Sequence, residues 1–288
     1  MIYILLSISC SVTVAVLLKL AKRYQINVLQ AVMWNYLAAI ILSCIFFKPD
    51  LQSAFAIVPS KIVMALGILL PVLFLILAAS VRNIGIVKTD ISQRLSLFIP
   101  ILASLFIFGE HFSDYKIAGL IVGFVAIILT LIKKSSIKAE TYSIIYPILV
   151  FVGFGVIDVL FKQLALDKSI PYTTAMLIAF CISFMVALII LIYTVTVKKH
   201  KIQLVNFLCG MVLGCFNFGN ILFYMKAHRA MSENPSTVFA AMNMGVIILG
   251  SLVGVVIFKE KVSRLNYAGI TLALIAILLI TLSQQHAV

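Results

Sequence analysis

The chain has 288 residues, of which 64% are hydrophobic and 11% are charged, and its mean hydropathy is +1.21. A soluble domain carries about 25% charged residues, so this composition excludes a water-soluble protein and predicts an all-α integral membrane protein. The net charge of +13 is concentrated between the apolar runs. That distribution is typical of membrane topology and gives no basic face for a nucleic-acid partner.

Successive apolar segments fill the chain, each about the ~20 residues that a helix needs to cross a bilayer. We therefore predict ten transmembrane helices with short connections. The first apolar run lacks a signal-peptide cleavage pattern and is expected to be a retained span. The predicted spans cover residues 2–20, 28–47, 60–80, 84–108, 115–132, 144–165, 172–197, 203–226, 234–258 and 265–283.

One segment, 90–132, occurs a second time at 240–282. The chain is therefore divided into a first repeat (1–132), an inter-repeat loop (133–143) and a second repeat (144–288). Each repeat has five spans, an odd number, so the second must enter the membrane in the opposite sense, and we predict two inverted five-helix repeats. Identical residues at an offset of 150 positions include Phe108 and Phe258, Glu110 and Glu260, Ser113 and Ser263, and Gly119 and Gly269.

These features resemble the drug/metabolite transporter superfamily, and its EamA-type members most closely: five spans in each half, a Glu that closes the fourth span and a Gly early in the fifth. The resemblance covers essentially the whole chain. It implies a ten-helix transporter with a central cavity between the halves, and members export or exchange amino acids, other metabolites, nucleotide sugars or drugs. It also implies cytoplasmic termini, whereas most of the 22 Lys and Arg lie on the opposite side from the termini, which predicts termini outside the cell.

Arg94 is the first candidate for substrate binding, because charge at membrane depth is costly and usually functional. It lies roughly 10 Å into its predicted span at 1.5 Å per residue. Asp90, Gln93 and Arg94 share a helical face, and Asp90 precedes Arg94 by four residues, the favourable order for an ion pair. Arg94 either binds an anionic group of the substrate, or snorkels to the interface or is neutralised by Asp90.

Amide side chains form a second group of candidates. Gln93 falls on Asn243 at the repeat offset, so both halves place an amide at the same point of their fourth span. Asn217, Asn220 and Tyr224 form one polar stripe on an otherwise apolar helix, and Asn35 lies in the second span. We interpret these residues as lining a substrate cavity, with interhelical hydrogen bonding as the alternative.

Four acidic positions form a third group of candidates. Asp158 lies midway through its span and, like Asp90, is a candidate for proton coupling, but a salt bridge from Asp158 to Lys162 is slightly favoured by their spacing of four residues. Glu110 and Glu260 close the fourth spans, where a carboxylate can accept N–H bonds at the start of the helix that follows. We therefore assign these two glutamates a structural role at the connection.

The sequence as a whole predicts a secondary transporter, not an enzyme, that exports or exchanges a small polar metabolite such as an amino acid by alternating access. It lacks a P-loop, so an ATP-driven pump is excluded, and we expect no metal and no cofactor. The alternatives are a flippase of lipids or lipid-linked sugars with the same fold and, with less support, a membrane enzyme on lipid-linked substrates. The expected location is the bacterial inner membrane, with lipids and a small-molecule substrate as partners and homodimerisation left open.

Overall fold

A computed structural model of the protein describes residues 2–24, 26–47, 60–84, 86–131, 145–167, 170–199, 201–257, 259 and 264–285. Glu260 and the inter-repeat loop lie outside these residues, and the side chain of Asp90 is also outside the description. The described residues form the helices α1 (Ile2–Arg23), α2 (Val28–Phe47), α4 (Lys61–Ile84), α5 (Ile86–Leu95), α6 (Phe98–Phe106), α7 (Asp114–Leu131), α8 (Ile145–Leu166), α9 (Tyr172–Lys198), α10 (Leu204–Ala230), α11 (Pro235–Val256) and α12 (Arg264–Gln285).

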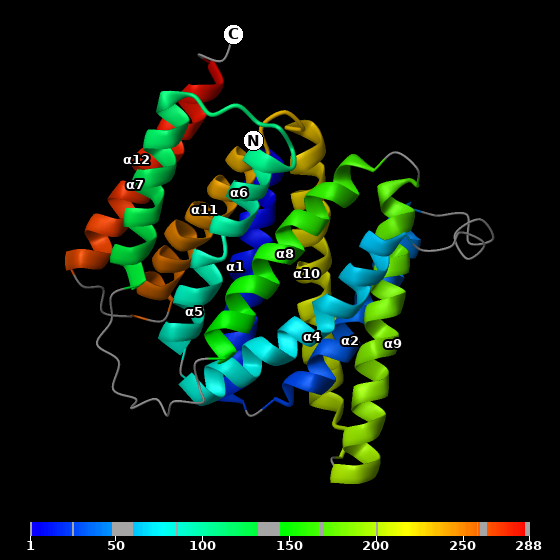
Figure 1. The fold of residues 1–288 in the computed structure, drawn as a ribbon. Helices are drawn as coiled ribbons and strands as arrows, with labels where there is room; N and C mark the ends of the chain where they lie inside the picture. Colours follow the sequence, from blue (N-terminus) through cyan, green and yellow to red (C-terminus); the bar gives the residue numbers. More distant parts are fainter. Residues whose placement is uncertain are drawn as a thin grey trace.

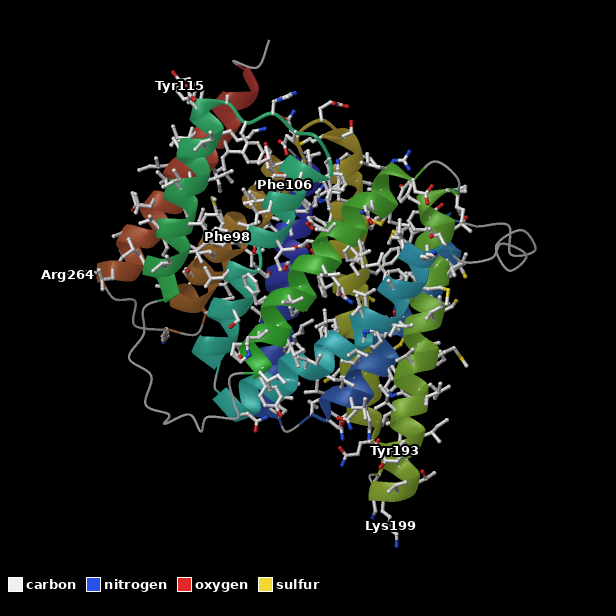
Figure 2. All side chains as sticks on the ribbon, in the orientation of Figure 1. Phe98, Phe106, Tyr115, Tyr193, Lys199 and Arg264 are labelled. Atoms are coloured by element: carbon white, nitrogen blue, oxygen red, sulfur yellow. The ribbon has the colours of Figure 1, made fainter. Side chains whose placement is uncertain are left out.

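Helices dominate because a chain this apolar must satisfy its backbone polar groups within each segment when it enters lipid. Among the described residues, seven helices are long and apolar enough to span a membrane, and shorter apolar helices cover 92–106 and 267–280. Many large apolar side chains on the outer surface are exposed, as Figure 2 shows for Phe98 and Phe106. The protein is therefore an integral membrane protein with several spans.

The fourth predicted span, 84–108, is divided into α5 and α6 at Ser96 and Leu97. Pro100 has no N–H to donate to the carbonyl of Ser96. That carbonyl accepts from the N–H of Ile99 at 3.0 Å instead, and the hydroxyl of Ser96 donates to the carbonyl of Gln93 at 2.6 Å. At the repeat offset Pro100 falls on Gly250, which keeps its N–H, and α11 is continuous.

Helices of the first half (1–132) pack on helices of the second half (144–288) (Figure 1). Most of these contacts occur twice, the second time between the equivalent helices with the two halves interchanged, and we call them exchanged pairs. The contact of α1 with α10 corresponds to that of α8 with α4, and the contact of α2 with α10 corresponds to that of α9 with α4. Likewise α1 contacts α11, as α8 contacts α5 and α6. Two pairs combine helices at the same place in both halves: α2 with α9, and α7 with α12, which stand side by side at the left of Figure 1.

Glycines allow the close approach of α10 to α2. A methyl group added to Gly214 would lie 2.5 Å from the carbonyl oxygen of Asn35 and 2.6 Å from Cβ of Ala38, whereas one added to Gly250 would meet no atom within 4 Å. We predict that Gly214→Ala destabilises the protein by about 1–3 kcal/mol through overpacking, and that Gly250→Ala, the matched control, changes little. Unfolding in mixed micelles measures both variants, and equal stability would contradict the packing role of Gly214.

Candidate functional site

A polar cavity of about 380 Å³ lies between the two halves of the bundle and is lined by residues of α1, α4, α5, α8, α10 and α11. Its wall is mainly apolar, with leucines and phenylalanines from α1, α4 and α8. The polar side chains converge on this cavity from four helices and include Gln93, Arg94, Asp158, Asn217, Asn220, Tyr224 and Asn243. A mostly apolar pocket with a few convergent polar groups is the usual form of a small-molecule site.

Arg94 and Gln93 reach this cavity from the last turn of α5. The break after Leu95 places the carbonyl end of this short helix at the cavity, because Gln93, Arg94 and Ser96 all line it. A cation is favoured beside the negative end of a helix dipole. The interrupted helix therefore presents Arg94 beside the cavity, in the manner of the discontinuous helices that form binding sites in transporters.

Asp158 enters the cavity from the middle of α8, and its Oδ1 accepts a hydrogen bond of 3.0 Å from the hydroxyl of Tyr224 on α10. The ring of Tyr224 packs edge-on against Phe161, with the ring centroids 6.2 Å apart. The sequence slightly favoured a salt bridge from Asp158 to Lys162, and the described residues do not form it. Lys162 is fully buried and donates to the carbonyl oxygens of Ser232 at 2.9 Å and His228 at 3.4 Å.

The predicted polar stripe of α10 is divided between the cavity and the contacts with neighbouring helices. Asn220 lines the cavity and its Oδ1 accepts from the hydroxyl of Ser7 on α1 at 2.8 Å. Asn217 also lines the cavity, and its amide donates to Oδ1 of Asn35 at 3.0 Å. Asn35 is fully buried and is not among the lining residues, so its place is behind the wall, where it ties α2 to α10.

The amides that are equivalent in the two repeats, Gln93 and Asn243, both line the cavity. Asn243 also donates to the carbonyl oxygen of Phe239 in its own helix at 3.1 Å. The repeat offset had predicted this convergence on one space.

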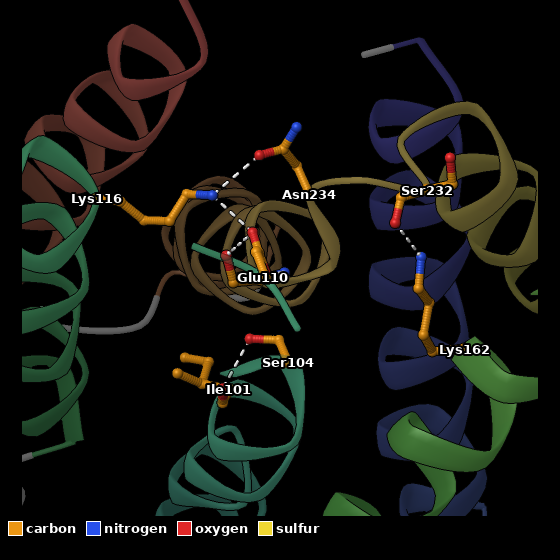
Figure 3. Close-up of polar contacts among 8 residues, drawn as sticks. Ile101, Ser104, Glu110, Lys116, Lys162, Ser232 and Asn234 are labelled. Atoms are coloured by element: carbon orange, nitrogen blue, oxygen red, sulfur yellow. Dashed lines mark hydrogen bonds and ion pairs between the residues drawn. The ribbon is translucent and has the colours of Figure 1, made fainter. Parts of the chain in front are cut away.

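Glu110 accepts a backbone N–H bond at the start of a helix, as predicted, but that helix is α11 and not α7, the helix that follows Glu110. Its carboxylate accepts from the N–H and the hydroxyl of Ser236, in the first turn of α11, at 2.9 and 2.7 Å. Lys116 of α7 donates to the same carboxylate at 2.6 Å and to Oδ1 of Asn234 at 3.0 Å (Figure 3). Sequence reasoning missed Lys116, Asn234 and Ser236, and their only signal was their proximity to the repeated Glu and to the start of a span.

Comparison with known proteins places the chain in a class. The model of the EamA-like transporter family matches residues 1–132 and 141–282. An uncharacterized protein of Haemophilus influenzae (strain ATCC 51907 / DSM 11121 / KW20 / Rd) is 41% identical over 282 residues, 95% of each chain. A protein crystal structure, 16% identical, covers 100% of this chain and 98% of its own with a TM-score of 0.72, which supports the fold.

The family match, together with the helices that can span a membrane, thus defines the class, a helical membrane transporter. The chain belongs to the EamA-like transporter family, as the resemblance in its sequence predicted.

Proposed function

We propose that the protein is a secondary active transporter that exports or exchanges a small polar metabolite by alternating access. The observation that carries this proposal is the central cavity, in which one guanidinium, one carboxylate and several amides converge inside an otherwise apolar bundle. Polar groups at membrane depth are expensive, and they mark substrate and ion pathways. A metabolite such as an amino acid fits the cavity volume and its mixture of charges and amides.

Ten spans in two inverted five-helix repeats are the architecture that we propose for this function. Support comes from the exchanged pairs of helix contacts, which an approximate two-fold relation between the halves would produce. An odd number of spans per half makes that relation an inversion across the membrane. An experimental structure in which 1–132 superposes on 144–283 without such an inversion would contradict it.

Within the cavity we assign Arg94 to an anionic group of the substrate, and Gln93, Asn220, Asn243 and Tyr224 to its polar groups. Asn217 and Asn35 hold the wall between α10 and α2. Asp158 is the proton-coupling candidate, because it lines the cavity and its described bond is to a neutral hydroxyl, not to a cation. Asp90, one turn before Arg94 in α5, is a second candidate.

The proposal is tested by comparing metabolites released from a strain that lacks the gene with those from an overexpressing strain. The compound that differs is then offered, radiolabelled, to proteoliposomes containing the purified protein. We expect uptake that saturates and is accelerated when unlabelled compound is loaded inside. Proteoliposomes that show no such uptake for any differing compound would contradict the proposed transport.

We place the protein in a bacterial inner membrane, in line with the bacterial source of its relative. From loop charge we predict that the loop Lys198 to Lys201, where α9 ends, is cytoplasmic. An impermeant thiol reagent should therefore leave Lys199→Cys unlabelled in intact cells and label it after permeabilisation. Labelling of intact cells would instead give the orientation that the family resemblance implies, with cytoplasmic termini.

A lipid or lipid-linked sugar is the second candidate substrate, and one observation favours it. An apolar pocket of about 330 Å³ lies between α1, α2 and α10 and shares Leu18 with the central cavity. An acyl chain could occupy it while a head group enters the polar cavity. Val212→Trp, which fills this pocket, should slow flipping of a fluorescent lipid and leave metabolite exchange unchanged. Equal flipping rates for the variant and the wild type would remove this candidate.

A further inference from the structure

A buried polar cluster joins the two halves of the bundle at one end. We define this Glu110 cluster as Glu110, Lys116, Asn234 and Ser236 (Figure 3). The first two belong to the connection before α7 and to α7 itself, in the first half, and the last two begin α11, in the second half. The side chains of Lys116 and Glu110 are 4% and 2% exposed, and their 2.6 Å ion pair is therefore enclosed by protein.

The cluster supplies the cap that α11 does not make for itself. Asn234 precedes α11, but its side chain makes no capping bond to that helix and accepts from Lys116 instead. The carboxylate of Glu110 accepts a hydrogen bond from the N–H of Ser236, one of the donors that have no partner within the helix at its start. An anion is also favoured there by the helix dipole. One half of the protein thus closes the helix start of the other half.

Buried aromatic rings of α10 and α11 pack together beside the cavity, near the start of α11. His228 is fully buried, with its ring 4.6 Å from that of Tyr224 and 4.7 Å from that of Phe239. Tyr224 and Phe161 form the adjoining wall of the cavity. Lys162 makes a further contact between the halves at the same end. It donates to the carbonyl oxygens of His228, in the last turn of α10, and of Ser232, just after that helix, and it lies 5.9 Å from the ring centroid of Phe108, two residues before Glu110.

The other end of the cavity is built differently. Leu18, Leu77 and Thr89 line the cavity toward the ends of α1 and α4 and the start of α5. Lys19 lies near the end of α1, the first helix of its repeat, and Lys162 lies at the corresponding place in α8, 143 positions later. Lys19 is exposed, whereas Lys162 is fully buried. Equivalent positions of the two repeats therefore have opposite burial. This difference is expected of a transporter held with one mouth closed and the other open.

We propose that Glu110 is the latch that keeps the mouth at the start of α11 closed, and that release of its bonds to Ser236 and Lys116 accompanies the opening of this mouth. The inference rests on the alternating access proposed above. A capping role in folding alone is the competing account. The latch and the capping role predict different results at the opposite mouth. If Glu110 is a latch in a two-state protein, opening the mouth at the start of α11 closes the opposite mouth, whereas loss of a cap alone closes nothing.

The test uses thiol labelling of purified protein in nanodiscs, where both faces are accessible, with the five native cysteines replaced by alanine. One reporter is Thr237→Cys, 1% exposed and directly behind the cluster; the other is Leu18→Cys, in the cavity wall toward the opposite mouth. Glu110→Gln should raise the labelling rate of Thr237→Cys by about tenfold and lower that of Leu18→Cys severalfold, as a population shift requires. Glu233→Gln, an exposed carboxylate in the same turn, is the matched control and should change neither rate.

If Glu110→Gln does not fold because Lys116 is left unpaired, the double variant Glu110→Gln, Lys116→Gln removes both buried charges and is measured in its place. Faster labelling at both reporters, or a lower melting temperature with unchanged labelling, would contradict the latch. Either result would show that Glu110 only caps α11 and stabilises the fold. Unchanged labelling with an unchanged melting temperature would also overturn it. No substrate enters this measurement, so a reciprocal change would support the latch even if every transport assay failed.

Discussion

Arg94→Gln is expected to weaken substrate binding by about ten- to a hundredfold, with near-normal expression and thermal stability. The reason is that the substitution keeps a polar side chain in the cavity wall and removes the charge-assisted hydrogen bonds to an anionic group, each about 1.5–3 kcal/mol. A factor of ten corresponds to about 1.4 kcal/mol. Concentration-dependent uptake into proteoliposomes measures the loss as a higher half-saturation concentration.

Two further variants separate binding by Arg94 from a structural role. Arg94→Lys keeps the charge but loses the planar fork that binds carboxylates with two bonds, so it should fall between the wild type and Arg94→Gln. If Arg94 only neutralises Asp90, removal of its charge should destabilise the protein, by about 3–5 kcal/mol for a buried pair. Adding Asp90→Asn should then restore both folding and transport. Such full rescue is incompatible with the binding role of Arg94.

The helices could be predicted from the sequence because their signal is local. Each apolar run is long enough to need internal hydrogen bonds in lipid, and each predicted range overlaps at least one described helix. The break of the fourth span was harder to foresee, because proline also occurs inside continuous helices. Pro71 lies within α4, which is uninterrupted, whereas Pro100 lies four residues after Ser96, whose hydroxyl and carbonyl find other partners.

The kinds of residue at the candidate site could also be predicted, since charges and amides stand out in apolar helices. Their partners could not, because partners come from distant helices. Asp158 and Lys162 are four residues apart, which predicts an ion pair, yet Lys162 donates to the carbonyl oxygens of Ser232 and His228, and Asp158 accepts from Tyr224. Asn35 satisfies Asn217 behind the cavity wall for the same reason. Helical spacing indicates a shared face and says nothing of the neighbour that the face meets.

Asp158→Asn is expected to abolish accumulation driven by a pH gradient while leaving exchange of substrate intact. Asparagine has nearly the same shape, and its Oδ1 can still accept the bond that Tyr224 donates to Asp158. It cannot bind and release a proton, however, so the variant has no means of coupling through this site. For one coupled proton, the wild type should build a concentration ratio of about tenfold per unit of imposed pH difference. The variant should stay near equal concentrations.

Tyr224→Phe is the complementary control for Asp158→Asn, because it removes the 3.0 Å hydrogen bond that the Asn variant can keep and leaves an ionisable carboxyl in the cavity. It should change the rate of transport and keep the accumulation. Both measurements are made in proteoliposomes with an imposed pH difference, and counterflow without that difference reports whether exchange survives. Accumulation by Asp158→Asn equal to that of the wild type would move the coupling role away from this residue, to Asp90 or to exchange without protons. Loss of both accumulation and counterflow would instead assign Asp158 to substrate binding, where its carboxylate would face a cationic group opposite the anion held by Arg94.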